Sequence, residues 1–593
     1  MKPALRFVRT LSVGCLVLAG VLVPEFASAA PAQIGIEPQP CVLIPQPVPS
    51  GATFRPADDF NSQGDYNYVH SSTNLQGQPA KEKFAAGLFW LPPAPAELSS
   101  FQSAVAVTNP DPVASTVVTI NFYDLFGTLV GTQSFNLGPE GTWVVPASPL
   151  QSIFSLTPGL GSAWVIGSDL AIVGETVHHA TTVDLSGFRG PLLSEPEPGN
   201  FGLNSLQQLQ MSQAGKDTLW FGPMPVSNTA PLDFLTGTAP LIWVVNPSPT
   251  TPTTVTLRYS SLGGVVLPPV TVTLPAHGAV LDQTLWNLLL PTYLAPSGSF
   301  DDDFRLVVSA TGPIVGDALM VDLFGGTSLS AGQRFRMGSA MLANSPSAQL
   351  VNPELTFQAG PPSVETIVGL YNPTLGNVGP VAVQYFDRNG ASLGVDSFAS
   401  FPRGFMVRIG PGLPASPNYP VAGVFAGYMR ITACVKGLVG WTMRQGSEVG
   451  HFGAAREVWG EELTGANGLE PGPGFLVTVG SETFMRKVSP LVRAGKSAPW
   501  PGYTTWVNDG ASNSGNYWFR FFDQLGANQS TAAGQFAGLR FGRTSFTYED
   551  PLVSPNATTN LSGRVDTTNG GFDGIHVIGD PLWEWGIFNF DND

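Results

Sequence analysis

One spacing recurs four times in this chain and constrains its fold more than any other feature. A short apolar run ends at an asparagine, and an aromatic residue follows thirteen positions later. The four pairs are Asn109 with Phe122, Asn246 with Tyr259, Asn372 with Tyr385, and Asn508 with Phe521. Because the asparagines recur every 126 to 137 residues, we predict that one folding unit is repeated four times.

The residues leading to each aromatic alternate as the residues of a strand do. Positions nine, eleven and thirteen after each asparagine share one face of a pleated backbone. The twelve residues at these positions are all apolar: Val118, Ile120, Phe122, Val255, Leu257, Tyr259, Val381, Val383, Tyr385, Tyr517, Phe519 and Phe521. The residues between them are mostly polar, so we expect one buried face and one exposed face.

A turn follows the aromatic, in "FYDLFG" (122–127), "YFDRNG" (385–390) and "FFDQLG" (521–526). An aspartate can accept bonds from its own backbone in a turn, and glycine supplies a positive φ there. We therefore interpret Asp124, Asp387 and Asp523 as turn residues and not as catalytic carboxylates. The second copy, "YSSLG", is one residue shorter and lacks the aspartate.

Each unit contains further strand signals. A second turn ends at Gly141, Gly278, Gly404 and Gly542, a final hairpin aligns on Gly174, Gly316, Gly440 and Gly586, and one candidate strand precedes each asparagine. About seven short strands in roughly 100 residues predict an antiparallel β-sandwich. Glycine and proline are abundant, at 68 and 54 residues, and only 12% of residues are charged. The fold class predicted is all-β, with four tandem sandwiches.

The predicted division of the chain follows from these units. The four sandwiches span 84–183, 217–324, 333–446 and 480–593, and the third is expected to open with the strand in "FRMGSAML" (335–342). Residues 31–83 form a low-complexity tail rich in proline, glutamine, serine and glycine. The segments 184–216 and 447–479 are expected to be linkers.

The first thirty residues have the pattern of a secretory signal peptide. Lys2, Arg6 and Arg9 precede an apolar run, and "ASA" (27–29) offers a small-residue cleavage site. An N-terminal membrane anchor is the alternative, although the run is short for a bilayer span. No later segment is apolar for long enough to span a membrane. We expect export, to the cell surface, the periplasm or the medium.

The net charge limits the partners. The whole chain carries −16, and removal of the leader takes away three positive charges and one negative, which leaves −18. Such a surface repels phosphate backbones, so nucleic acid is not expected as a partner.

The repeat pattern resembles the tandem immunoglobulin-like or fibronectin III-like modules of bacterial secreted and surface proteins. The resemblance covers most of residues 84–593 and rests on period and strand pattern; the cysteine and tryptophan signature of antibody domains is absent. It implies adhesion, scaffolding or cell-envelope assembly, with envelope proteins or glycans as partners, and self-assembly is compatible with it. We expect a structural or binding protein.

Motifs for catalysis are sparse, so we do not expect an enzyme. The six histidines form no metal-binding motif; His178 and His179 are adjacent, His277 lies in a turn and His576 in the closing hairpin. The alternative function is a carbohydrate-binding or carbohydrate-hydrolysing protein, whose site would use loop carboxylates and tryptophans such as Trp459, Trp500 and Trp518.

The one dense acidic cluster is "FDDDF" (300–304). It is expected either as a solvated loop before a strand or as a calcium site formed by Asp301, Asp302 and Asp303. Oxygen ligands suit calcium, but three consecutive carboxylates lack the alternate spacing of an EF-hand loop. No other cofactor is expected.

Export leaves two cysteines, Cys41 in the tail and Cys434 at the bend of the third unit's final hairpin. The other units have Ser168, Ala310 and Asp580 at this bend, so the module itself does not require a cysteine. We predict a disulfide between Cys41 and Cys434, which an oxidising compartment permits.

Repetition also predicts a shape. If each unit closes its own core, the four units should lie as a chain of beads that touch only along the sequence. Such a chain would have a radius of gyration of roughly 45 Å, against about 24 Å for one globule of this length.

Overall fold

The structure is a computed structural model whose regular secondary structure is nearly all β-strand over the residues it describes. Those residues are 82–90, 100–145, 159–167, 172–181, 201–205, 218–229, 234–288, 300–326, 334–342, 349–358, 363–374, 376–387, 391–421, 424–435, 437–447, 456–462, 464–465, 475–479, 482–494, 502–507, 516–535, 543–547, 559–567, 573–580 and 583–589. The prediction of an all-β chain of tandem antiparallel sandwiches is confirmed.

Each repeat is a sandwich of two antiparallel layers of four main strands, here named layer A and layer B, and in the first three repeats a short strand pairing joins the two layers into one sheet. In the first repeat, layer A runs β4 (Leu129–Leu137), β3 (Thr116–Asp124), β6 (Gly159–Gly167) and β1 (Glu82–Trp90), and layer B runs β5 (Thr142–Val145), β2 (Ser100–Thr108), β7 (Val173–Thr181) and β8 (Phe201–Ser205). In the second, layer A runs β12 (Val270–Leu274), β11 (Thr253–Ser261), β14 (Phe300–Ala310) and β9 (Thr218–Thr229), and layer B runs β13 (Ala279–Asp282), β10 (Phe234–Val245), β15 (Val315–Gly326) and β16 (Arg334–Leu342).

The last two repeats keep the same strand order. In the third, layer A runs β20 (Ser392–Phe398), β19 (Val381–Asp387), β22 (Val424–Ala433) and β17 (Gln349–Gln358), with β25 (Thr464–Gly465) beside β17, and layer B runs β21 (Met406–Ile409), β18 (Ser363–Tyr371), β23 (Val439–Ser447) and β24 (Arg456–Glu462). In the fourth, layer A runs β30 (Asn528–Gln535), β29 (Asn516–Phe522), β32 (Thr559–Thr567) and β27 (Glu482–Ala494), with β26 (Phe475–Val479) beyond β27, and layer B runs β31 (Arg543–Thr547), β28 (Gly502–Val507), β33 (Asp573–Asp580) and β34 (Trp583–Asn589).

Over the described residues the first two repeats therefore have eight strands and the last two have nine, against about seven indicated by the sequence pattern. The strand at Arg334–Leu342, expected to open the third repeat, pairs with β15 and closes the second. The strand that opens the third repeat is β17, which pairs with β22. The two segments expected to be linkers contain β8 and β24, which pair with β7 and β23.

The alternating strand before each corner is confirmed where side chains are described. Val118, Ile120 and Phe122 are fully buried, as are their equivalents in the second and third repeats, and Phe521 is 4% exposed. The side chains of Tyr517 and Phe519 lie outside the described set.

The repeated asparagine is a buried residue whose side chain hydrogen-bonds two loops together. Asn246 is fully buried, and its Nδ2 donates to the carbonyls of Thr251 and Pro275 at 2.8 Å each. Its Oδ1 accepts from the amide of Ser248 at 2.9 Å. One side chain therefore connects the loop that follows β10 to the turn that follows β12.

The same connections form in the first and third repeats. Asn109 donates to the carbonyls of Ala114 and Gly138, at 2.7 and 3.0 Å. Asn372 donates to those of Gly376 and Phe401, at 2.8 Å each. A buried amide with all of its partners stabilises a loop pair, whereas removal of one partner costs about 1–3 kcal/mol per orphaned group. Asn508 is outside the described residues.

The corner aspartates are confirmed as turn residues. Oδ1 of Asp124 accepts from the amides of Phe126 and Thr128, at 2.9 and 2.8 Å. Asp523 accepts from two amides of its own turn in the same way, and Asp387 from the amide of Ala391. These bonds hold the corner, and Gly127 closes it with a φ of 78°.

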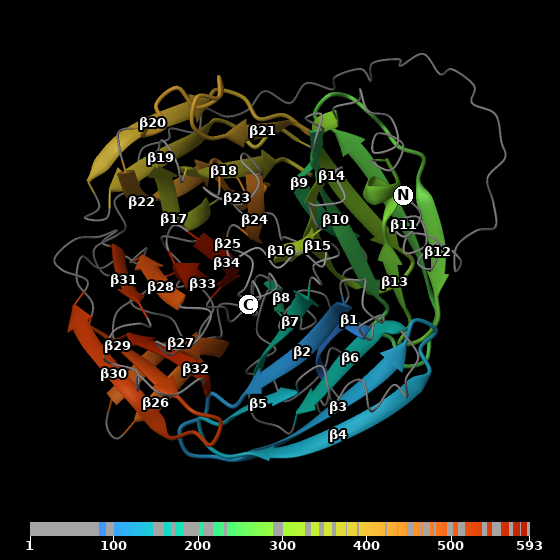
Figure 1. The fold of residues 1–593 in the computed structure, drawn as a ribbon, viewed down its shortest axis with the longest axis vertical. Coiled ribbons are helices and arrows are strands. Elements are labelled where there is room, and N and C mark those ends of the chain that lie inside the picture. Colours follow the sequence, from blue (N-terminus) through green and yellow to red (C-terminus); the bar gives the residue numbers. More distant parts are fainter. Residues whose placement is uncertain are drawn as a thin grey trace.

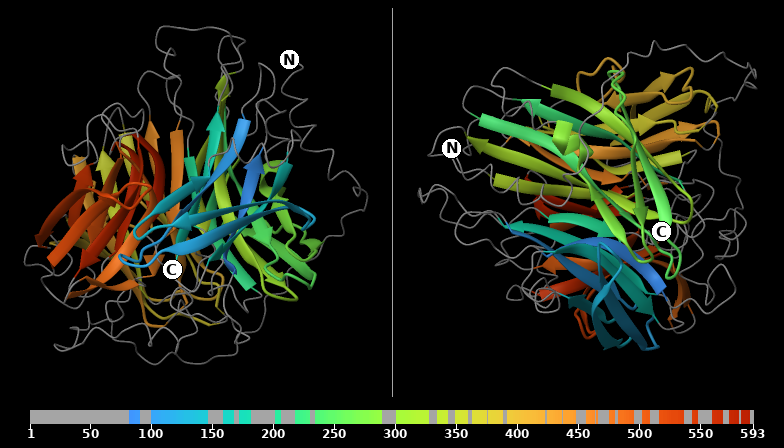
Figure 2. Two further views of the ribbon diagram at one scale, coloured as in Figure 1. Left: turned by 90° about the horizontal axis from the view of Figure 1, so that it is seen from below. Right: turned by 90° about the vertical axis from the view of Figure 1, so that its right-hand side faces the viewer.

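The four repeats are arranged in a closed ring (Figure 1). Layer A of each repeat packs on layer B of the next: β1 contacts β10 and β15, β9 contacts β18 and β23, β17 contacts β28 and β33, and β27 contacts β2 and β7. The innermost strands β8, β16, β24 and β34 contact one another in this order, and β34 returns to β8. Seen edge-on, the repeats lie at one level (Figure 2).

The prediction of an extended chain of beads is therefore wrong. Alternate residues of β10 explain why: Ile242 and Val244 join the core of their own repeat, whereas Trp243 and Val245 join the core of the first repeat. Layer B is apolar on both faces because a layer A covers each of them. The strand before each corner has one exposed face, so the alternation there carries no sign of this second contact.

The repeated corner is the part that docks on the next repeat. The carbonyl of Leu125 accepts from the amide of Ala279, and a Cβ on Gly127 would lie 1.9 Å from the carbonyl oxygen of Ala276. The fourth corner docks on the first repeat in the same way. The carbonyl of Gln524 accepts from the amide of Thr142, and a Cβ on Gly526 would lie 2.0 Å from the Pro139 oxygen.

Gly127→Ala should therefore weaken the ring more than a positive φ alone requires. We expect a loss of about 3 kcal/mol or more in the free energy of unfolding, from backbone strain plus the clash. The matched control is Gly264→Ala, since Gly264 has a φ of 90° but no atom within 4 Å of its Cβ position. That variant should lose only about 1–2 kcal/mol. Equal losses in urea titrations of the two variants would contradict the docking.

Candidate functional site

The acidic cluster of the sequence lies at the junction of the second and third repeats. Asp301, Asp302 and Asp303 fall within β14, where they pair with Ser227, Val226 and Pro225 of β9. The expectation of a solvated loop is therefore wrong, because the carboxylates belong to a paired strand. Successive side chains of a strand point to opposite faces, so neighbouring carboxylates of the cluster are held apart.

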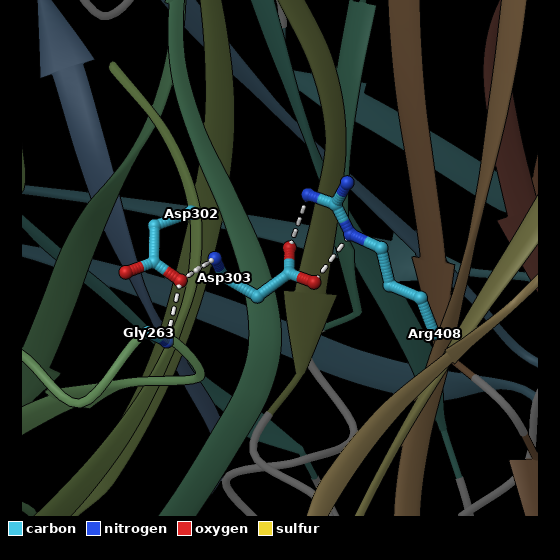
Figure 3. Close-up of polar contacts among 4 residues, drawn as sticks. All are labelled: Gly263, Asp302, Asp303 and Arg408. Atoms are coloured by element: carbon cyan, nitrogen blue, oxygen red, sulfur yellow. Dashed lines mark hydrogen bonds and ion pairs between the residues drawn. The ribbon is translucent and has the colours of Figure 1, made fainter. Parts of the chain in front are cut away.

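Asp303 faces the third repeat and is 3% exposed (Figure 3). Its Oδ1 accepts from Nη2 of Arg408 at 2.6 Å, and its Oδ2 forms an ion pair with Nε of the same guanidinium. Such two-point pairing of arginine and carboxylate fixes both side chains in one plane. The pair connects β14 of one repeat to β21 of the next.

Asp302 lies on the other side of the strand (Figure 3). Its Oδ1 accepts from the amides of Gly263 and Asp303, at 3.0 and 2.8 Å, and so holds the shortened second corner. The side chain of Asp301 is outside the described set. Within the described part of the chain, no three His, Cys, Asp or Glu side chains gather to hold a metal. The calcium site stays a prediction, which melting with millimolar calcium and with chelator would test.

Arg305 reinforces this junction from the same face of β14. Its Nε donates to Oγ of Ser260 at 2.6 Å, its Nη1 donates to the carbonyl of Gly404, and its guanidinium lies 5.1 Å from the ring centre of Tyr371. Gly404 belongs to the turn that is equivalent to those contacted by the first and fourth corners. A polar clamp thus takes the place of the glycine contact where the corner is one residue short.

The junction of the first and second repeats is aromatic. His277, in the second repeat's turn with a φ of 56°, stacks on Tyr123 at 4.3 Å between ring centres and meets Trp164 edge-on at 4.6 Å. Its Nδ1 is buried and has no hydrogen-bond partner among the described residues. Burial lowers the pKa of His277 from its ordinary value of 6.5, because the desolvated ring disfavours the charged form.

Two buried tyrosine and aspartate pairs lie inside the sandwiches. The Tyr259 hydroxyl donates to Asp282 at 2.6 Å, and the Tyr385 hydroxyl donates to Asp396 at 2.7 Å. Burial, with the adjacent carboxylates, raises the pKa of both phenols. In the first repeat the equivalents of Tyr259 and Asp282 are Phe122 and Val145, so an apolar pair fills this core position there.

The other candidate residues are not brought together. Trp459 lies on β24 in layer B of the third repeat, Trp518 lies on β29 in layer A of the fourth, and Trp500 is outside the described residues. His178 and His179 are on β7, and His576 is on β33. The residues expected to form a carbohydrate site are therefore spread over separate layers.

Cys434 lies between β22 and β23, at the predicted bend, and it is disulfide-bonded. The two other cysteines of the chain, Cys15 and Cys41, are outside the described residues. The pairing of Cys434 with Cys41 stays a prediction.

The residues that sequence reasoning missed are Arg305, Arg408 and the packing role of His277. Asp303 and Arg305 share one strand face by their spacing of two, which is the only local signal. Their partners lie about 100 residues away in the next repeat, so nothing short of the ring arrangement identifies them. None of the helical residues in the described part of the chain forms a segment with the length and hydropathy of a membrane span.

Arg408→Leu should destabilise the second junction, because it leaves Asp303 buried without its cation. Loss of one partner of a buried ion pair costs about 3–5 kcal/mol, whereas apolar replacement of both is often neutral. We expect the double variant Asp303→Leu with Arg408→Leu to regain most of the loss in urea unfolding. Asp302→Asn, on the opposite face, is the control and should cost about 1 kcal/mol. A double variant as unstable as the single one would contradict the pairing.

The stability of the ring should fall in mild acid through His277. Its pKa is lowered in the folded state, so the unfolded chain takes up the proton first, and the free energy of unfolding decreases as pH falls below about 6.5. His277→Asn tolerates a positive φ and does not titrate. The difference in unfolding free energy between the two proteins should therefore shrink from pH 7.5 to pH 5. A constant difference would show that His277 does not contribute to the pH dependence.

The repeated and candidate residues of this chain thus form the junctions between repeats and the buried polar pairs. No protein-family model matches the sequence, and no curated protein matches it. A function is therefore argued from these residues and from the ring that they close.

Proposed function

We propose that this protein is an exported, non-catalytic structural or binding protein of the cell envelope or extracellular space. The observation that carries the proposal is the use made of the repeated polar residues. The asparagines fasten loops, the corner aspartates hold turns, and Asp303 with Arg408 joins two repeats. The polar residues that the chain repeats thus serve to hold its fold together.

The ring favours a scaffold over a flexible spacer. Contacts that return from the fourth repeat to the first leave no terminal module free to swing. A closed array of buried layers holds its outer surface in a fixed arrangement, which suits attachment to several points of a partner at once. Envelope proteins or glycans are the proposed partners, and the net charge of −16 disfavours nucleic acid.

Export is proposed from the leader-like residues 1–30 and not from the fold. The basic start, the apolar run and the small residues at 27–29 are arranged as a secretory signal requires. The low content of charged residues and the strand-rich repeats agree with an envelope or extracellular setting by resemblance only.

The proposal is tested by fractionation and complementation in cells of the native host. We expect the protein in the exported fractions, and we expect loss of its gene to alter the envelope or surface attachment. Gly264→Ala should complement, whereas Gly127→Ala, which weakens the ring, should not. Purified protein should leave polysaccharide and ester substrates unchanged.

Two results would overturn the proposal. One is a cytoplasmic location. The other is substrate turnover by the purified protein that survives repeated chromatography and is lost on substitution of a single carboxylate.

A further inference from the structure

Each layer A ends at the circumference of the ring in an edge strand (Figure 1). These strands are β4, β12, β20 and β30, each at the outer end of its sheet. An edge strand presents unpaired amide and carbonyl groups that can pair with another chain. Folded proteins protect such edges with charge, proline, short length or a covering segment, so the four copies can be compared.

Two of the edges are visibly protected. β12 has only five residues and directly follows Pro268 and Pro269. β20 is covered by the segment around Asn418, whose Nδ2 donates to the carbonyl of Val395 at 3.0 Å. β20 also contains an aspartate, Asp396, buried against the core.

The third edge, β30, has little to offer a partner. Its sequence, "NQSTAAGQ", contains no apolar side chain larger than alanine. A strand of this kind gains little by burying its side chains against a neighbour.

β4 has neither charge, proline nor short length, no described segment covers it, and the bulge at Val130 interrupts only its first residues. It runs for nine residues, "LVGTQSFNL", without a charge or a proline. Phe135 lies across from Val118 on its core-side face, where it stacks on Trp143 at 5.2 Å between ring centres, yet it is 42% exposed. In the part of the chain that the structure describes, the backbone of β4 pairs with β3 alone.

We propose that β4 is a self-association edge, which pairs antiparallel with β4 of a second copy of this chain. The pairing is centred on Gln133, the middle residue of the strand, and so places each residue opposite its mirror position. Phe135 then lies across from Gly131 of the other copy, an arrangement in which an aromatic ring covers a glycine on the neighbouring strand.

The second copy is favoured over another protein by symmetry and charge. An antiparallel pair of identical strands is self-complementary about a two-fold axis and uses up the edge, so assembly stops at the dimer. Both copies carry a net charge of −16, and like charges oppose their approach. A nine-residue strip without any charge is where two such molecules can meet at least cost. The dimer would form whether or not the protein is exported.

The test compares one substitution on two equivalent strands. Ser134 on β4 and Thr271 on β12 are both exposed, and each hydroxyl bonds a threonine of the adjacent strand, at 2.8 and 3.3 Å. Sedimentation of the full chain should show a monomer–dimer equilibrium. Ser134→Lys should raise its dissociation constant about tenfold, because the two new cations lie diagonally across the pair. Thr271→Lys should leave the constant unchanged.

Cross-linking fixes the register. Gln133→Cys should join two chains on oxidation, since residue 133 faces its own copy, whereas Val270→Cys, at the equivalent place on β12, should not. A monomer at every concentration would overturn the proposal. So would a dimer indifferent to Ser134→Lys, equal cross-linking at both positions, or growth into open polymers.

Discussion

The structure depends on one buried side-chain amide in each of the first three repeats. Asn246 and its equivalents donate the hydrogen bonds that water would otherwise supply to carbonyls of two loops. These loops are far apart in sequence, and the asparagines are fully buried. A sandwich made of short strands has many such loops and few charges to fix them. The asparagine sets where the turn after β12 lies, and that turn is the surface on which the preceding repeat docks. Local hydrogen bonding thus determines how the repeats assemble.

The junctions solve the same packing problem with different chemistry. Between the first two repeats a histidine enters between Tyr123 and Trp164, and between the fourth and the first a glycine corner meets Pro139. Between the second and third, where the corner is shortened, Asp303 and Arg305 supply ionic and cation–π contacts. The geometry is kept while its side chains change, as expected when backbone placement and not a particular contact is what the ring requires.

Much of a single repeat could be predicted, because its signals are local. The period of two at Val118, Ile120 and Phe122 gave the buried face, and Asp124 gave the corner. The assignment of β16 failed because a strand between two repeats carries no sign of which neighbour it pairs with. The ring could not be predicted for a related reason. Its sign in the sequence is that layer B is apolar on both faces, as where Trp243 follows Ile242, and a continuous apolar run indicates burial but not which repeats cover the two faces. The ion pair of Asp303 could not be foreseen, since its partner is set by that ring.

The close approach at Gly127 has a consequence for how such a chain can change over time. A contact made through a backbone with no side chain between the surfaces leaves almost no freedom in the angle between successive units. Each of the four units covers about a quarter of the ring, so a fifth unit could not be inserted without altering every corner at once. Open solenoids gain and lose repeats freely. Here the geometry of the corner sets the number of repeats, and a chain with one unit duplicated would no longer close into a ring.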